Sequence, residues 1–180
     1  SRGLGDVYKR QLFFFLIACQ QNTSNNLLYS SKFDDIKYFG EDSFLVEGTD
    51  ITDSLKENKY DRLPASYKGV VREPVWNLSK NSAGLSIRFL SNSSVITAKW
   101  ELLNNFSMNH MPDTGIKGID LYFKNNDKWQ YINTGIPRGF NNEYRLIDNM
   151  DNELREYKIF LPLYDGIKNL SLIHISEPTR

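Results

Sequence analysis

The chain has 180 residues with 22 basic and 22 acidic side chains, so its formal net charge at pH 7 is zero. This balance gives no electrostatic reason to expect a nucleic acid as a partner, and the length suits one domain. One cysteine and two histidines are too few imidazoles and thiolates, in no suitable spacing, for a zinc site. We therefore expect no metal and no cofactor.

The two ends of the chain do not continue the patterns of their neighbours. Residues 1–11 can be encoded by DNA whose reverse complement encodes residues 170–180, and two natural protein ends have no reason to be related in this way. The pair resembles a transposon-based sequencing adapter read at both ends of a short insert. We therefore exclude both segments from the fold prediction and expect the reading frame to continue beyond residue 169. In the remaining body, acidic residues slightly outnumber basic ones, and His110 is the one histidine.

Residues 12–19 are an apolar run that ends in the only cysteine, Cys19. The run is too short to span a bilayer, which takes roughly 20 residues, but it suits the end of a signal peptide. The sequence Leu16-Ile17-Ala18-Cys19 resembles a bacterial lipobox, in which the cysteine is lipidated. Residues 20–28 follow as a polar tether. These segments predict an exported protein, lipid-anchored in the bacterial cell envelope at the periplasm or outer membrane; a buried strand ending in a free cysteine is the alternative.

Alternating hydrophobicity predicts strands along most of the body. From Leu85 to Phe89 and from Val95 to Leu102, apolar side chains occupy every second position, and the turn-forming residues 91–94 separate the two segments. We expect these strands to form an antiparallel hairpin with one solvated face.

Further strand signals follow along the chain. The segments 119–123 and 129–132 flank a polar loop of hairpin length. A strong strand signal covers 156–163, and shorter signals lie at 144–147 and on both sides of Pro74. Residues 50–58 have a helix-like composition. Short strands separated by turns predict an all-β fold, an antiparallel β-sandwich or jelly-roll-like single domain over residues 29–169.

Catalytic groups are scarce in this sequence. A nucleophilic serine needs a base within hydrogen-bonding reach, oriented by a third group, and His110 is the one such base in the body. Because His110 lies in a loop of proline and glycine, we interpret it as a packing or interface residue. The carboxylate pairs at 34–35, at 41–42 and at 148 and 151 lie in polar, turn-like contexts, so we expect solvated turns rather than a glycosidase pair. No position is predicted to be catalytic.

Aromatic residues suggest a sugar-stacking surface as a second kind of site. Trp76 and Trp100 lie in apolar segments and are expected in the core. Trp129 and Tyr131 lie at the edge of the predicted hairpin, where glycan stacking and packing remain open alternatives.

Asp120 lies between Ile119 and Leu121 in a predicted strand and therefore points away from their face. A carboxylate in such a strand must be paired or solvated, and we consider Arg62 as its partner. Gly118 and Tyr122 complete the sequence Gly-Ile-Asp-Leu-Tyr around it.

This sequence, residues 118–122, resembles the Gly-x-Asp-Leu-Tyr domain found ahead of the catalytic domain in a group of SGNH/GDSL-type esterases. The likeness extends, in the same order along the chain, to the blocks 60–64, 75–79, 82–89, 110–115 and 160–166. Each block is short, and the ordered set carries the resemblance over nearly the whole body.

The resemblance implies a β-sandwich accessory domain that is not itself catalytic and that packs on a missing hydrolase domain, shaping its active-site opening. The parent protein would be an acyl-ester hydrolase, with acylated carbohydrate as one substrate class. We expect Met108, His110, Met111 and Thr114 to form the domain interface. Two alternatives remain: a stand-alone carbohydrate-binding lipoprotein, and an enzyme in its own right.

Overall fold

The computed structural model describes residues 36–175. The adapter-like residues 1–11, the signal peptide with Cys19 and the tether at 20–28 lie outside the described residues, as does the carboxylate pair at 34–35. The lipid anchor and the export that it implies therefore stay predictions.

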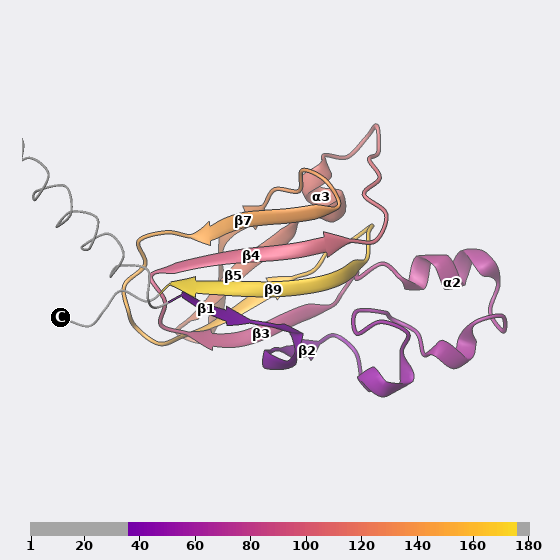
Figure 1. Cartoon of the computed structure of the whole chain (residues 1–180), viewed down its shortest axis with the longest axis horizontal. Helices are drawn as coiled ribbons and strands as arrows, with labels where there is room; N and C mark the ends of the chain where they lie inside the picture. Colours follow the sequence, from indigo (N-terminus) through magenta and orange to yellow (C-terminus); the bar gives the residue numbers. More distant parts are fainter. Residues whose placement is uncertain (1–35, 176–180) are drawn as a thin grey trace, which may run out of the picture. The chain divides into compact units, whose positions relative to one another are not determined.

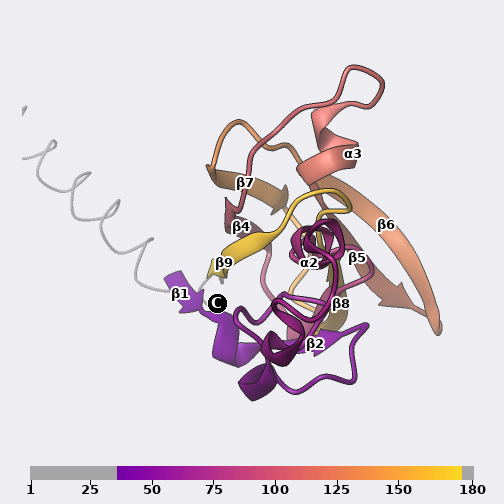
Figure 2. The ribbon, with the colours of Figure 1, turned by 90° about the vertical axis from the view of Figure 1, so that its right-hand side faces the viewer.

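Within the described residues, nine strands form two antiparallel sheets. The two sheets face each other, as the end-on view in Figure 2 shows. The four-stranded sheet has the order β1 (Ile36–Phe39), β9 (Ile167–Ile175), β4 (Val95–Leu102), β7 (Asn141–Ile147). The five-stranded sheet has the order β2 (Leu45–Glu47), β3 (Ser86–Ser91), β8 (Arg155–Phe160), β5 (Ile119–Asn125), β6 (Lys128–Gly135). The predicted all-β sandwich is confirmed.

Short helices join the strands. The 3₁₀ turns η1 (Glu41–Ser43), η2 (Asp53–Leu55) and η3 (Ala65–Tyr67) precede the helix α2 (Glu73–Ser79), and α3 (Asp113–Lys117) leads into β5. Figures 1 and 2 show α2 and α3 at the same end of the sandwich, which we call the helical end.

The core lies between the two sheets and follows the predicted alternation. In β4, every second side chain is buried, from Ile96 through Trp100 to Leu102, as are Ile87 and Phe89 in β3. The intervening side chains face solvent on the outer side of each sheet. Alternation with period two therefore explains which face of each strand is inside.

The predicted hairpin of β3 and β4 is wrong, because the two strands belong to different sheets. β3 pairs with β2 and β8, whereas β4 pairs with β7 and β9. Two strands that bury their apolar sides in one core show the same alternation whether they lie side by side or face each other. The second hairpin, β5 with β6, is confirmed; Asn126 and Asp127 form its two-residue loop, and both have positive φ, as a type I′ turn requires.

The strand signals on both sides of Pro74 are also wrong, since Val70 and Val71 lie in a turn and Val75 and Trp76 lie in α2. Proline in the first turn of a helix loses no hydrogen bond, because the N–H groups there have no intrahelical acceptor. Trp76 lies in the helix and is buried as predicted. The helix-like segment 50–58 contains one 3₁₀ turn, η2.

Strand β9 runs past the predicted domain end at residue 169. Leu170 and Leu172 point into the core while Ser171 lies between them at an outer position. Whatever their origin, residues 170–172 carry the alternation of a half-buried strand, and residues 170–175 pair with β4.

Candidate functional site

The loops of the helical end meet at one buried carboxylate, that of Asp165. Its side chain has 0 % exposure and accepts hydrogen bonds from the backbone N–H groups of Asn104 (3.0 Å), Asn105 (2.7 Å) and Gly166 (2.8 Å). The side-chain amide of Asn104 donates a fourth at 3.2 Å. Asp165 thus ties the chain after β4 to the turn before β9.

A buried lysine fixes the far side of the same loop. Lys117 is 4 % exposed, and its Nζ donates to Asn105 Oδ1 (2.9 Å) and Ser107 Oγ (3.3 Å) and lies 3.2 Å from Asp113 Oδ2. Hydrogen bonding from Ser107, with Lys117 as a further cause, lowers the pKa of the Asp113 carboxyl, so it stays ionised. The segment from Asn105 to Lys117 is therefore held at both ends.

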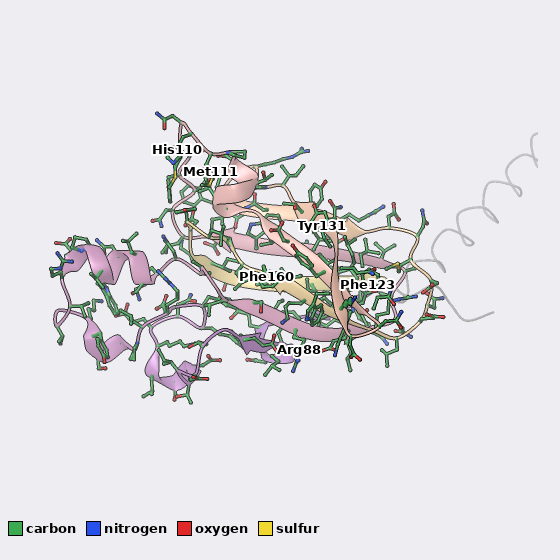
Figure 3. All side chains as sticks on the ribbon, turned by 180° about the vertical axis from the view of Figure 1, so that it is seen from behind. Arg88, His110, Met111, Phe123, Tyr131 and Phe160 are labelled. Atoms are coloured by element: carbon green, nitrogen blue, oxygen red, sulfur yellow. The ribbon has the colours of Figure 1, made fainter. Side chains whose placement is uncertain are left out.

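Between these anchors, the loop presents the predicted interface residues Met108, His110, Met111 and Thr114. A β-bridge joins Met108 to Met111, and both side chains are half-buried. The His110 ring is exposed, with Nδ1 3.0 Å from Asn109 Oδ1, so it faces an amide rather than an acid or a serine hydroxyl. Figure 3 shows His110 and Met111 in the loop that projects beyond the sheets.

Several large apolar side chains are exposed on the surface of the helical end. Hydrogen bonds join the segments that carry them: Leu102 N–H to Phe140 O (2.8 Å), Leu103 N–H to Gly166 O (2.8 Å) and Tyr164 N–H to Ile116 O (2.9 Å). The exposed large apolar side chains on these segments and around α2 are Val70, Val75, Leu78, Phe106, Ile136, Phe140, Leu163 and Tyr164. So many at one end of a sandwich are typical of an interaction surface.

The residues of the sequence 118–122 alternate between the core and the outer face of β5, after a glycine at its start. A Cβ atom on Gly118 would lie 2.4 Å from Thr114 O, so glycine allows α3 and β5 to approach. Leu121 is fully buried, whereas Asp120 and Tyr122 point to the outer face of the five-stranded sheet. Asp120 accepts a hydrogen bond from Thr134 Oγ1 at 2.5 Å.

The pairing of Asp120 with Arg62 that we considered from the sequence is wrong. The Arg62 guanidinium donates to the carbonyl oxygens of Leu78 (2.6 Å) and Asn81 (2.9 Å). These carbonyls lie at and just beyond the C-terminal end of α2, where helix carbonyls lack intrahelical partners. Arg62 therefore caps α2. The hydrogen-bond partner of Asp120 is Thr134 and not Arg62.

Trp129 and Tyr131 lie on the same outer face as Asp120 and Tyr122. Tyr131 is exposed, while Trp129 is half-buried with the Lys158 ammonium 4.6 Å from its ring centroid. Trp100 lies in the core, as predicted. A cation thus partly covers the ring of Trp129, whereas the ring of Tyr131 is exposed to solvent.

Comparison with protein families identifies the domain that carries this motif and this loop. The model described as the GxDLY N-terminus of SGNH hydrolase-type esterases matches residues 36–177. The chain belongs to this family. The five residues that give the GxDLY family its name are Gly118 to Tyr122.

Two longer chains of known structure are similar to this one over less than half of their length. A protein of Bacteroides ovatus ATCC 8483 described as a GDSL-like lipase matches with a TM-score of 0.71 and 35% identity, over 81% of this chain and 44% of that one. The salicylyl-acyltransferase SsfX3 from a tetracycline biosynthetic pathway shares the fold, with a TM-score of 0.55 and 10% identity over 82% of this chain and 43% of its own. This GxDLY chain therefore spans less than half the length of both. No curated protein matches it significantly.

A serine and a histidine do meet inside this GxDLY domain, and the sequence reasoning missed them because His174 was set aside with the C-terminal segment. Ser91 Oγ lies 3.2 Å from His174 Nδ1. Both side chains are buried, and the His174 ring lies 4.6 Å from that of Phe39. Burial lowers the His174 pKa to about 4. A pair enclosed in this way packs the core and cannot reach a substrate.

Carboxylates of the GxDLY domain gather at a groove of about 620 Å³ on the outer face of the four-stranded sheet. Glu101 is held by the Asn169 amide (2.7 Å) and Lys168 (3.3 Å), and Glu143 pairs with Lys99 (3.2 Å). The hydrogen bond from Asn169, and then that from Lys168, lowers the Glu101 pKa. A general acid needs a raised pKa, so Glu101 is suited to accept hydrogen bonds and not to protonate a leaving group.

Two further observations concern the part of the chain that the structure describes. Residues 36–175 contain no group of three or more His, Cys, Asp or Glu side chains placed to hold a metal ion. They also contain no helix with the length and apolar character needed to cross a membrane.

Proposed function

We propose that this GxDLY domain is a non-catalytic accessory module of an SGNH-type ester hydrolase, and that its helical end packs against the hydrolase domain in cis. The observation that carries the proposal is the family match to the N-terminal part of such esterases, over residues 36–177. The match covers 44% of the Bacteroides ovatus protein. The larger, uncovered part of that protein leaves room for a hydrolase domain.

The surface chemistry of the helical end supports its choice as the interface. Phe106, Phe140 and Leu163 are large, apolar and exposed, and burial of such side chains provides about 25 cal/mol per Å² of area removed from water. Methionine side chains adapt to an irregular partner surface, and Met108 and Met111 lie in the projecting loop.

Rigidity of the loop adds to this argument. Lys117 and Asp165 fix both ends of the segment that carries His110. A loop ordered before docking loses less conformational entropy on binding than a free one. The hydrolase domain would therefore meet a preformed surface, with the exposed imidazole of His110 at its edge.

The experiment uses the full-length protein expressed from the complete source DNA, with p-nitrophenyl acetate as the ester. Phe106→Asp and Leu163→Asp place a charge in the proposed interface, and Leu154→Asp is a matched control on an exposed leucine in the loop between β7 and β8. Relative to the control, we expect the first two variants to lower the kcat/KM of the full-length protein severalfold or to lower its Tm. The Tm of the isolated GxDLY domain should change little in all three, because the side chains are exposed.

Two results would contradict the proposal. One is a stop codon directly after the matched region of the source DNA. The other is a full-length protein in which the three variants are indistinguishable in Tm and in ester hydrolysis.

A further inference from the structure

The outer face of the five-stranded sheet carries aromatic rings in a regular grid. In the strand register, Lys158 of β8 lies opposite Tyr122 of β5, and Tyr122 lies opposite Tyr131 of β6. In the neighbouring row, Phe160 lies opposite Asp120. We call Tyr122, Tyr131 and Phe160 the aromatic face; Figure 3 labels the two outer rings, Tyr131 and Phe160.

Tyr122 supports the two exposed rings from between. Its centroid lies 5.6 Å from that of Tyr131 at an interplanar angle of 70° and 5.3 Å from that of Phe160 at 84°. Such edge-to-face pairs are favourable beyond their area of contact. Tyr131 and Phe160 are 55% and 40% exposed. Because the strand β5 lies between β6 and β8, the two rings stand about 10 Å apart across the sheet.

Hydrogen bonds hold the outermost ring in place. The Tyr131 hydroxyl lies 2.8 Å from Thr134 Oγ1, which donates in turn to Asp120 Oδ1 at 2.5 Å. Asp120 and Tyr122, two residues of the family motif, thereby fix the position of Tyr131. A ring fixed before binding gives a ligand a preformed surface.

The charges around the aromatic face are balanced. Arg88 lies 3.1 Å from Glu47 and 3.4 Å from Glu156; Lys158 lies 2.7 Å from Glu47, and Lys124 lies 3.6 Å from Glu156. Paired charges give no net attraction for a polyanion, which argues against a nucleic acid or an anionic membrane. Charged side chains are also depleted from the centres of protein–protein interfaces, so this mixture does not suit a protein partner.

We infer that the aromatic face binds a neutral polysaccharide chain. A pyranose ring has an apolar C–H side that stacks on an aromatic ring and a rim of hydroxyls that exchange hydrogen bonds with flanking polar groups. Tyr131 and Phe160 provide two stacking positions. Lys158, Asp120 and Glu156 provide donors and acceptors beside them. This ligand goes beyond the accessory role proposed above and uses a surface other than the helical end.

The test uses the chain itself, so its outcome is independent of esterase activity. Isothermal titration and affinity gel electrophoresis measure binding of cellohexaose, xylohexaose and mannohexaose and of the corresponding soluble polysaccharides. Tyr131→Ala and Phe160→Ala, singly and together, remove the stacking rings. Tyr38→Ala is a matched control, because Tyr38 is an exposed tyrosine in β1 of the other sheet.

We expect at least one of these glycans to bind, the double variant to bind it at least about tenfold more weakly, and Tyr38→Ala to bind it as the unchanged chain does. The Tm of each variant checks that the fold is kept. The inference is overturned if none of the glycans binds, if the double variant retains the affinity, or if Tyr38→Ala loses it equally. Sedimentation velocity tests whether this face is instead an interface between two copies of the chain. A dimer that the double variant dissociates would also overturn the inference.

Discussion

Replacing Asp165 by alanine should be among the most destabilising single changes in this domain. The substitution removes the acceptor of four hydrogen bonds, three of them from backbone N–H groups. Hydrogen bonds to a charged group contribute about 1.5–3 kcal/mol each, and a buried donor left without an acceptor costs about 1–3 kcal/mol. These effects are not additive, and water can reach the exposed Asn104, so we expect a loss of about 3–5 kcal/mol.

That loss compares with a total of about 5–15 kcal/mol for a typical domain. Urea unfolding followed by tryptophan fluorescence measures it, and the corresponding fall in Tm would be about 10 °C or more. Asp165→Asn should cost less, about 2 kcal/mol, because an amide oxygen can keep the bonds made by Oδ1, whereas its NH₂ group would face the Asn105 N–H.

The control is Asp148→Ala, at an exposed position in the turn after β7 whose carboxylate lies 3.4 Å from Arg145. Exposed ion pairs contribute about 0–1 kcal/mol. If Asp165→Ala and Asp148→Ala lost the same small amount, below about 1 kcal/mol, the view that Asp165 holds the helical end together would be refuted.

Two further predictions concern His174 and Gly118. Since the folded-state pKa of His174 is lowered to about 4 from about 6.5 in the unfolded chain, the unfolded state binds the extra proton between these pH values. The free energy of unfolding should therefore fall as the pH drops from 6.5 to 4, by at most about 3 kcal/mol, and His174→Gln should flatten this difference in urea titrations; parallel pH profiles for the two proteins would contradict the assignment. Gly118→Ala should cost about 1–3 kcal/mol, because its Cβ would meet a backbone oxygen at 2.4 Å, whereas Gly139→Ala, where the Cβ meets nothing within 4 Å, should be nearly neutral in the same assay.

The sequence predicts the sandwich and its inner faces because burial on one side of a strand imposes a period of two. Val95 to Leu102 shows this most clearly, since its predicted bounds are those of β4. The same period cannot distinguish strands that share a sheet from strands that face each other, which is why the pairing of β3 with β4 was wrong. α2 escaped prediction because seven residues give too few turns for a helical period to show.

The candidate sites were predictable in part. The loop from Met108 to Thr114 and the motif from Gly118 to Tyr122 stand out as residues, but the groups that organise them are distant in sequence. Asp165 follows Asn105 by 60 positions, and Phe160 comes next to Tyr122 only through the pairing of β8 with β5. Such contacts depend on strand order, which local patterns do not contain.

The order of strands in the four-stranded sheet also has a consequence for how the domain forms. Among the strands of residues 36–175, β9 comes last in sequence, yet it lies between β1, the first of them, and β4. Until β9 has left the ribosome, β1 has no neighbour in this sheet and one edge of β4 stays open, so the core is exposed on that side. Closing two loops of such length raises the entropic cost of the folding transition state. We therefore expect slow folding, and chains that stop before β9 should aggregate through their open strand edges.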